Sequence, residues 1–211
     1  MSASESENGM NRADLLQRVE LMETMIAEGR RSMCRHGWIF LLWGIVCLLP
    51  MGWWHLQPDS NWVGKWAWPV CLFFGWVLTA IGMKLQQSGR PVHRSATNRS
   101  IGAVWGVMGA AMGIYVLSAI LSHHSHQVSY LAGILLILGM AHATSAAILR
   151  WRAQAVVAAF YWAGAISMFC NLPMQRLSQI FLAEICIGGI LFGLYTMLME
   201  RRGGAWGRNH A

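Results

Sequence analysis

Apolar residues are gathered into six long runs along this chain of 211 residues. Short polar segments separate the runs, which occupy residues 37–54, 66–83, 101–121, 128–149, 153–172 and 177–199. About 20 predominantly apolar residues in a helix cross a hydrocarbon core of about 30 Å. The pattern therefore predicts an all-α integral membrane protein with six transmembrane helices.

Basic residues lie almost entirely on one side of these six predicted spans. If the N-terminus is placed inside, the outside loops hold only Lys65 and Arg176 of the 16 basic residues. The others all fall inside: Arg12, Arg18, Arg30, Arg31, Arg35, Lys84, Arg90, Arg94, Arg99, Arg150, Arg152, Arg201, Arg202 and Arg208. Cytoplasmic segments of membrane proteins carry such an excess of Lys and Arg. We therefore expect a plasma (bacterial inner) membrane protein with both termini in the cytoplasm.

Composition agrees with this interpretation and argues against nucleic acid as a partner. Apolar residues make up 55% of the chain and charged residues only 12%. The formal net charge of +7 is spread over helix ends and short loops, so its expected counterpart is the anionic surface of the lipid bilayer. The first apolar run begins only near Gly37, so we expect that span itself, and not a cleaved signal peptide, to start insertion.

The segment before the first span divides into two parts. Residues 1–10 are rich in Ser, Glu and Asn, and we expect them to be disordered. Residues 11–35 instead show helical periodicity, and their apolar face consists of Leu15, Leu16, Val19, Met22 and Ile26. This part is predicted to be a cytoplasmic amphipathic helix.

The polar faces of that helix mix acidic and basic residues, whereas a helix lying on lipid usually has a face rich in Lys and Arg. The mixture favours a helix that docks a partner protein or a second copy of the chain. Folding back onto the bundle is the alternative.

Residues 36–200 form the predicted six-span bundle, and residues 201–211 a cytoplasmic tail. The odd-numbered spans carry similar short motifs, Trp43-Gly44, Trp105-Gly106 and Trp162-Ala163-Gly164. These are compatible with three tandem two-helix hairpins, because internal repeats are common in membrane bundles. Chance similarity among helices of one composition is the alternative.

Glycines recur at helical spacing in two of the spans. Gly102, Gly106, Gly109 and Gly113 fall on one face of the third span, within an arc of about 60° at 100° per residue. Gly189 and Gly193 repeat this spacing in the sixth. Small residues let helices approach closely in lipid, so both sets are predicted packing faces, in the same chain or against another.

Two ionisable residues lie inside the predicted spans, His142 in the fourth and Glu184 in the sixth. Such residues are costly within a membrane and are candidates for function by default. Their positions along the two spans differ in depth by about 12 Å, which argues against a direct ion pair. A structural hydrogen bond is the alternative role for each.

The outside loop after the third span contains His123, His124 and His126. Imidazole is a ligand for zinc, copper, nickel and iron, so these residues are weak candidates for a metal site. Adjacent histidines rarely point at one ion, and we expect neither a metal nor another cofactor.

None of the common catalytic motifs occurs in the chain, so we do not expect an enzyme. The favoured function is a non-catalytic accessory or scaffold subunit that docks a partner through its N-terminal helix. One alternative is a small transporter or channel with Glu184 and His142 in its path. A second is an outward-facing metal or haem binder that uses His123, His124 and His126.

Overall fold

The computed structural model describes residues 3–56, 66–87, 96–122, 127–170 and 172–208. Every regular element within these residues is a helix, which confirms the predicted all-α class. In chain order the helices are α1 (Ala3–Arg35), α2 (Gly37–Leu56), α3 (Trp68–Gln87), α4 (Ala96–Ser122), α5 (Gln127–Leu149), α6 (Arg152–Ser167), α7 (Met174–Ile185) and α8 (Phe192–Arg208). A π-helical segment, η2 (Cys186–Leu191), joins α7 to α8.

Among the described residues, four helical segments are long and apolar enough to cross a membrane. They are Trp68–Gln86, Ala96–Ser118, Tyr130–Leu149 and Gln175–Arg202. A fifth candidate is the pair Asp14–Arg35 and Gly37–Trp53, which is bent by 41° at its break.

The fifth predicted span is shorter than its apolar run. Helix α6 has 16 residues and ends at Ser167, and the N–H groups of Phe169 and Cys170 then make tighter bonds to the carbonyls of Ile166 and Ser167. At about 1.5 Å per residue, α6 is about 24 Å long. It thus falls below the length of an ordinary span.

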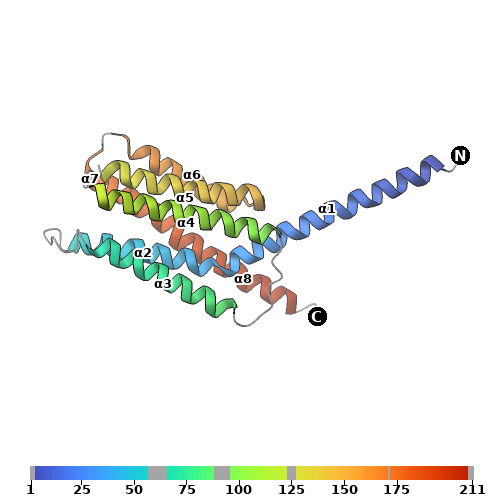
Figure 1. Cartoon of the computed structure of the whole chain (residues 1–211), viewed down its shortest axis with the longest axis horizontal. Helices are drawn as coiled ribbons and strands as arrows, with labels where there is room; N and C mark the ends of the chain where they lie inside the picture. Colours follow the sequence, from blue (N-terminus) through green and yellow to red (C-terminus); the bar gives the residue numbers. More distant parts are fainter. Residues whose placement is uncertain (1–2, 57–65, 88–95, 123–126, 171, 209–211) are drawn as a thin grey trace.

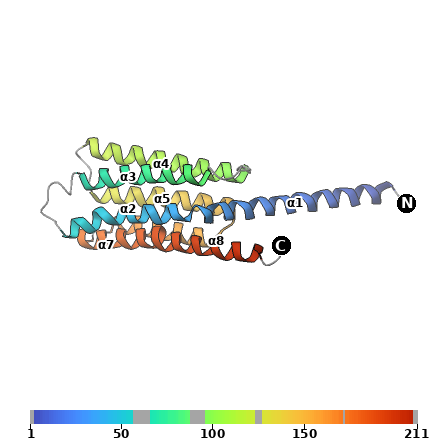
Figure 2. The same ribbon diagram turned by 90° about the horizontal axis from the view of Figure 1, so that it is seen from below.

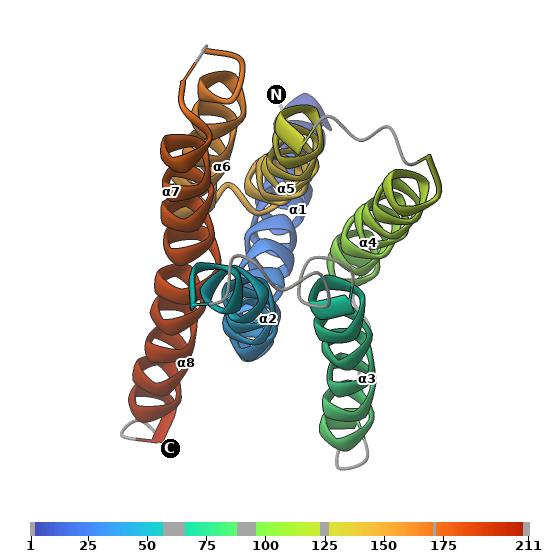
Figure 3. The same cartoon turned by 90° about the vertical axis from the view of Figure 1, so that its left-hand side faces the viewer.

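Helices α2 to α8 run roughly along one common direction, and α1 extends beyond them (Figures 1 and 2). Seen from its end, the bundle has α2 and α5 in the middle, with α3 and α4 on one side and α6, α7 and α8 on the other (Figure 3). The most extensive contact is between α5 and α6, while α3 packs mainly on α2, and α4 on α5.

The hydrophobic core lies between α2, α5, α6, α7 and α8. Its fully buried centre includes Leu135 on α5 and Phe181 on α7, and Tyr161 of α6 packs against the same cluster. Helices α3 and α4 place only partly buried residues at its edge, such as Trp68 and Met112. The candidate functional side chains therefore sit in the half of the bundle formed by α5–α8.

Helix α1 begins at Ala3, eight residues before the sequence-based boundary at residue 11. Residues 3–10, expected to be disordered, are helical, because adding residues to an existing helix costs little once its nucleus has formed. The C-terminal tail is also helical, to Arg208. The base of α1 contacts the bundle through Gly29, which lies against Leu149, and through buried Met33.

The turn between α5 and α6 is fixed by an arginine from α1. Arg150 has a φ of 48°, a left-handed conformation uncommon outside glycine. The Arg30 guanidinium donates to the carbonyl oxygen of Leu149 at 2.8 Å and to that of Arg150 at 2.6 Å. Arg30 thus satisfies carbonyls at the end of α5, where the helix leaves them without partners.

Candidate functional site

His142 is one of the few polar residues buried in the interior of the bundle, and only 1% of its surface is exposed. Four aromatic side chains from four other helices surround its ring. Their ring centroids lie 5.5 Å away for Phe40, 5.1 Å for Trp105, 5.5 Å for Tyr161 and 5.2 Å for Phe192. His142 therefore faces the interior of the bundle, among aromatic side chains of the neighbouring helices.

Polar atoms around His142 lack hydrogen-bond partners among the described residues. They include Nδ1 of His142, Oγ of Ser145 and both side-chain polar atoms of Gln154. Ser145 lies four residues before the end of α5 and Gln154 two residues after the start of α6, so both lie near the turn that joins these helices. The structural hydrogen bond that is the alternative role of His142 is thus not made by its Nδ1 atom within the described residues.

Glu184 is buried on α7, beside Gly164, which lies about one turn beyond Tyr161 on α6. A Cβ atom at Gly164 would lie 2.7 Å from Cγ of Glu184, so the missing side chain there makes room for the carboxyl group. The hydroxyl group of Tyr161 packs against Gly188, one turn from Glu184. Tyr161 therefore lies between the two ionisable residues, and no ion pair joins them within the described ranges.

The helix beside Glu184 departs from regular α geometry. The π-helical turns Cys186–Leu191 begin two residues after it and contain buried Gly188 and Gly189. Such segments are rare and occur frequently at functional sites. Sequence reasoning missed this feature; its only local signal is the pair of adjacent glycines.

The polar groups thus follow the core from Gln154 and Ser145 through His142 and Tyr161 to Glu184. Chains of histidines and carboxylates carry protons in pumps and transporters. All five side chains are buried, and a surface groove on α5 and α6 is lined by other residues. These five polar side chains could pass a proton along the core or bind a small polar solute once water reaches them.

The two glycine sets occupy very different surroundings. A Cβ at Gly189 would lie 2.7 Å from Cα of Gly44, and one at Gly193 would lie 2.7 Å from the backbone nitrogen of Leu41. Gly189 and Gly193 therefore form a close seam with α2. The stripe on α4 does not pack in this way.

Around three glycines of that stripe, Gly102, Gly106 and Gly113, a Cβ would meet no described atom within 4 Å apart from the adjacent residues and the local backbone of α4. The fourth, Gly109, meets only the ring of Trp76, at 3.1 Å. Among the described residues the α4 stripe therefore packs only at Gly109, and its packing against another chain stays a prediction.

The N-terminal helix forms the second candidate site, because its free part exposes an apolar stripe. Its exposed residues include Leu15, Leu16, Val19 and Met22, while Ile26 is half-buried. None of these five packs in either hydrophobic cluster of the described chain. The candidate partner surface is thus uncovered in the isolated chain.

The histidines predicted as weak metal ligands, His123, His124 and His126, lie outside the described residues. Within the described ranges, no group of three His, Cys, Asp or Glu side chains could hold a metal ion.

No protein-family model, no curated protein and no solved structure matches this chain.

Proposed function

We propose that this protein is a membrane-embedded, non-catalytic accessory or scaffold subunit that docks a partner protein through α1. The observation that carries the proposal is the projection of α1 beyond the bundle with its apolar stripe uncovered (Figures 1 and 2). Exposed apolar surface of this kind in a polar segment marks an interaction site.

The shape of the stripe favours another helix as the partner. Leu15, Val19, Met22 and Ile26 are spaced by four, three and four residues, and they fall within an arc of about 60° at 100° per residue. So narrow a stripe is typical of a coiled-coil seam. Leu16 lies about 100° from Leu15 and borders the seam.

Charges on the two sides of this seam have opposite signs. Arg18 lies on one edge and Glu23 on the other, and Arg18 also binds Asp14 of its own helix at 2.9 Å. Residues at these edges choose the partner and its direction in coiled coils. Two copies in one membrane would project α1 in the same direction, and a parallel pair would then bring Arg18 of one copy close to Glu23 of the other. A second copy is therefore one partner that fits the seam.

The topology that accompanies this function is the six-span arrangement with both termini cytoplasmic. It is supported by the distribution of basic residues, and it requires α6 to cross as a short span, which bilayers accommodate at a modest cost by thinning. Reporter fusions after Arg94 and after Arg208 are expected to read cytoplasmic, and a fusion after His126 external. A cytoplasmic reading at His126 would overturn the orientation or the number of spans.

Cross-linking in intact membranes tests the docking function. Glu23→Cys, in a chain whose native cysteines are replaced by alanine, is expected to give a cross-linked product with a short bismaleimide. Gln17→Cys, on the opposite face of α1, is the control and is expected to give much less. A product of twice the chain's mass identifies a second copy, and any other mass identifies a different protein.

Two adjacent leucine-sized residues provide a matched test of the seam. Leu21 and Met22 are 60% and 55% exposed, but only Met22 lies in the stripe. We expect Met22→Glu to abolish the cross-link and Leu21→Glu to leave it unchanged. Equal effects of both substitutions, or no product with any variant, would contradict docking through this seam.

Removal of the projecting part should leave the bundle intact. The truncation must stop before Gly29 and Arg30, because both contact the α5–α6 end of the bundle. A chain that starts at Met25 is therefore expected to insert and melt like the full chain but to lose its partner on purification in mild detergent. If this truncation unfolds the bundle, α1 is part of the fold and the docking proposal loses its support.

A second candidate function is that of a small transporter or channel, which the row of buried polar groups favours. His142, Tyr161 and Glu184 would then line the path. Purified protein in liposomes is expected to carry protons in this case, and Glu184→Gln or His142→Phe to abolish the flux. Flux that both substitutions leave unchanged would exclude these residues from the path.

A further inference from the structure

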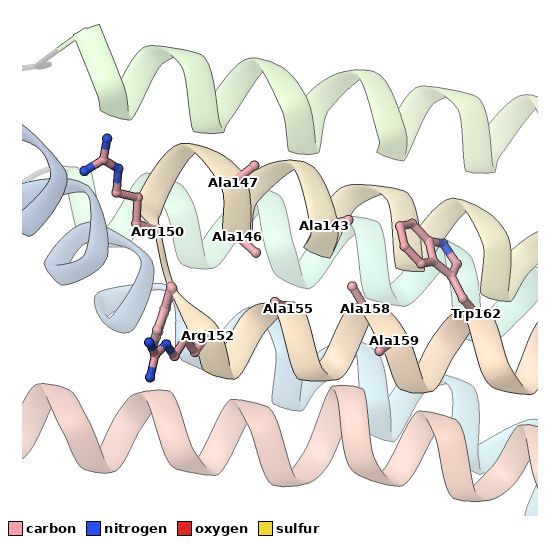
Figure 4. Close-up of a pocket in the computed structure, with 10 residues that line it drawn as sticks. Ala143, Ala146, Ala147, Arg150, Arg152, Ala155, Ala158, Ala159 and Trp162 are labelled. Carbon is pink, nitrogen blue, oxygen red and sulfur yellow. The ribbon is translucent and has the colours of Figure 1, made fainter.

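A shallow groove of about 450 Å³ runs along the outer face of the α5–α6 hairpin (Figure 4). Alanines from both helices line it, including Ala143 and Ala147 on α5 and Ala155 and Ala159 on α6. Because methyl side chains are short, they let the two helices pack closely and leave a smooth depression between them. The groove wall is apolar along most of its length.

The two ends of the groove differ in chemistry. Arg150 and Arg152 lie at one end, on either side of it, and Trp162 lies toward the other (Figure 4). The indole ring of Trp162 packs over Gly139 of the facing helix. Three turns of α6, about 15 Å, separate Arg152 from Trp162. This is half of a hydrocarbon core of about 30 Å, the thickness of one leaflet.

The two arginines are available to bind an anion. Both side chains are exposed, and neither guanidinium forms an ion pair or hydrogen bond with any other described residue. The backbone between them is held by Arg30, which donates to two carbonyls of the turn. Helix α6 also begins here, and Trp151 gives its N-terminus no side-chain cap. Arginine side chains and free helix N–H groups together favour phosphate.

We propose that this groove binds one anionic phospholipid of the cytoplasmic leaflet. Its phosphate contacts Arg150 and Arg152, and one acyl chain follows the alanines toward Trp162. The assignment of leaflet rests on the orientation proposed above, in which this turn faces the cytoplasm. Basic pockets between helices on that side of a membrane bind anionic headgroups.

A second copy of the chain fits the groove less well than a lipid. A symmetric contact through α5 and α6 places the same surface on both sides of the interface. Arg150 and Arg152 of each copy would then approach those of the other, and like charges across an interface are unfavourable. An anionic lipid instead complements both arginines.

Native mass spectrometry of the full chain in detergent tests the proposal, with phosphatidylglycerol and phosphatidylcholine as probes. The wild type is expected to retain one phosphatidylglycerol in preference to phosphatidylcholine. Arg150→Gln with Arg152→Gln is expected to weaken that binding by about tenfold or more, on the scale of roughly 1 kcal/mol per basic residue. Arg201→Gln with Arg202→Gln, two exposed arginines of α8, is the matched control and should change little.

Filling the groove provides a test that does not alter charge. Ala155→Leu is expected to weaken binding of phosphatidylglycerol, whereas Ala163→Leu, exposed on the same helix but outside the groove, should not. Equal losses in the two arginine pairs, or undiminished binding with Ala155→Leu, would overturn the proposal. So would a dimer that dissociates when Arg150 and Arg152 are replaced, or inorganic phosphate that displaces the lipid completely at equal concentration.

Discussion

Helices α3 and α4 are nearly as apolar as α5 and the α7–α8 segment, yet they are buried to a very different extent. Mean hydropathy is 1.5 and 1.7 for the spans of α3 and α4, against 1.9 for each of the other two. The buried share is 11% and 6% in the first pair, but 50% and 44% in the second. Lipid solvates apolar side chains as well as a protein core does, so apolarity alone does not drive helices together in a membrane.

Close contact between backbones and polar groups distinguishes the two regions. Gly189 and Gly193 bring η2 and α8 against α2, and Gly164 and Gly188 make room for Glu184 and the Tyr161 hydroxyl. Helix α4 contains as regular a set of glycines but exposes most of it. The presence of small residues therefore permits close packing without requiring it.

The largest expected difference between the two regions concerns matched phenylalanines. Phe181 on α7 is fully buried, whereas Phe73 on α3 is 64% exposed. We expect Phe181→Ala to destabilise the bundle by about 3–5 kcal/mol, because it leaves a cavity in the core. Phe73→Ala should cost less than about 0.5 kcal/mol. Thermal unfolding in detergent measures both, and similar losses would mean that α3 is buried in an assembly.

A smaller difference is expected between the two glycine faces. Gly189→Ala would place its Cβ 2.7 Å from Cα of Gly44, where backbone must move, at a cost of about 1–3 kcal/mol. Gly106→Ala, with open space around it, should change the melting temperature by less than about one degree. If Gly106→Leu lowers the stability of an oligomer but not of the monomer, the α4 stripe packs against another chain.

The smallest expected effect is at His142. Its Nδ1 has no hydrogen-bond partner in the described part of the chain, and its ring packs among aromatic rings. His142→Phe is therefore expected to leave stability within about 1 kcal/mol of the wild type, since an apolar ring of similar shape removes an unsatisfied polar atom. His142→Ala is the control and should be clearly less stable, because it leaves a cavity. A large loss with phenylalanine would show that the imidazole nitrogens stabilise the core.

Several features of the fold were accessible from periodicity and charge. The helices that cover the second, third, fourth and sixth apolar runs lie where the hydropathy pattern predicts them. The end of α6 at Ser167 and the π-helical turns after Glu184 were not predicted. Both depend on how the chain packs locally and not on how apolar it is.

The sequence by itself determined which segments are helical and apolar, because backbone hydrogen bonding in lipid leaves the helix as the structure for a long apolar run. Only the tertiary structure decided which faces of those helices meet. It placed Tyr161 between His142 and Glu184, and it left Gly106 exposed while burying Gly189. The physical reason is that helix association in a membrane depends on the fit between particular surfaces, which residues distant in the chain supply together.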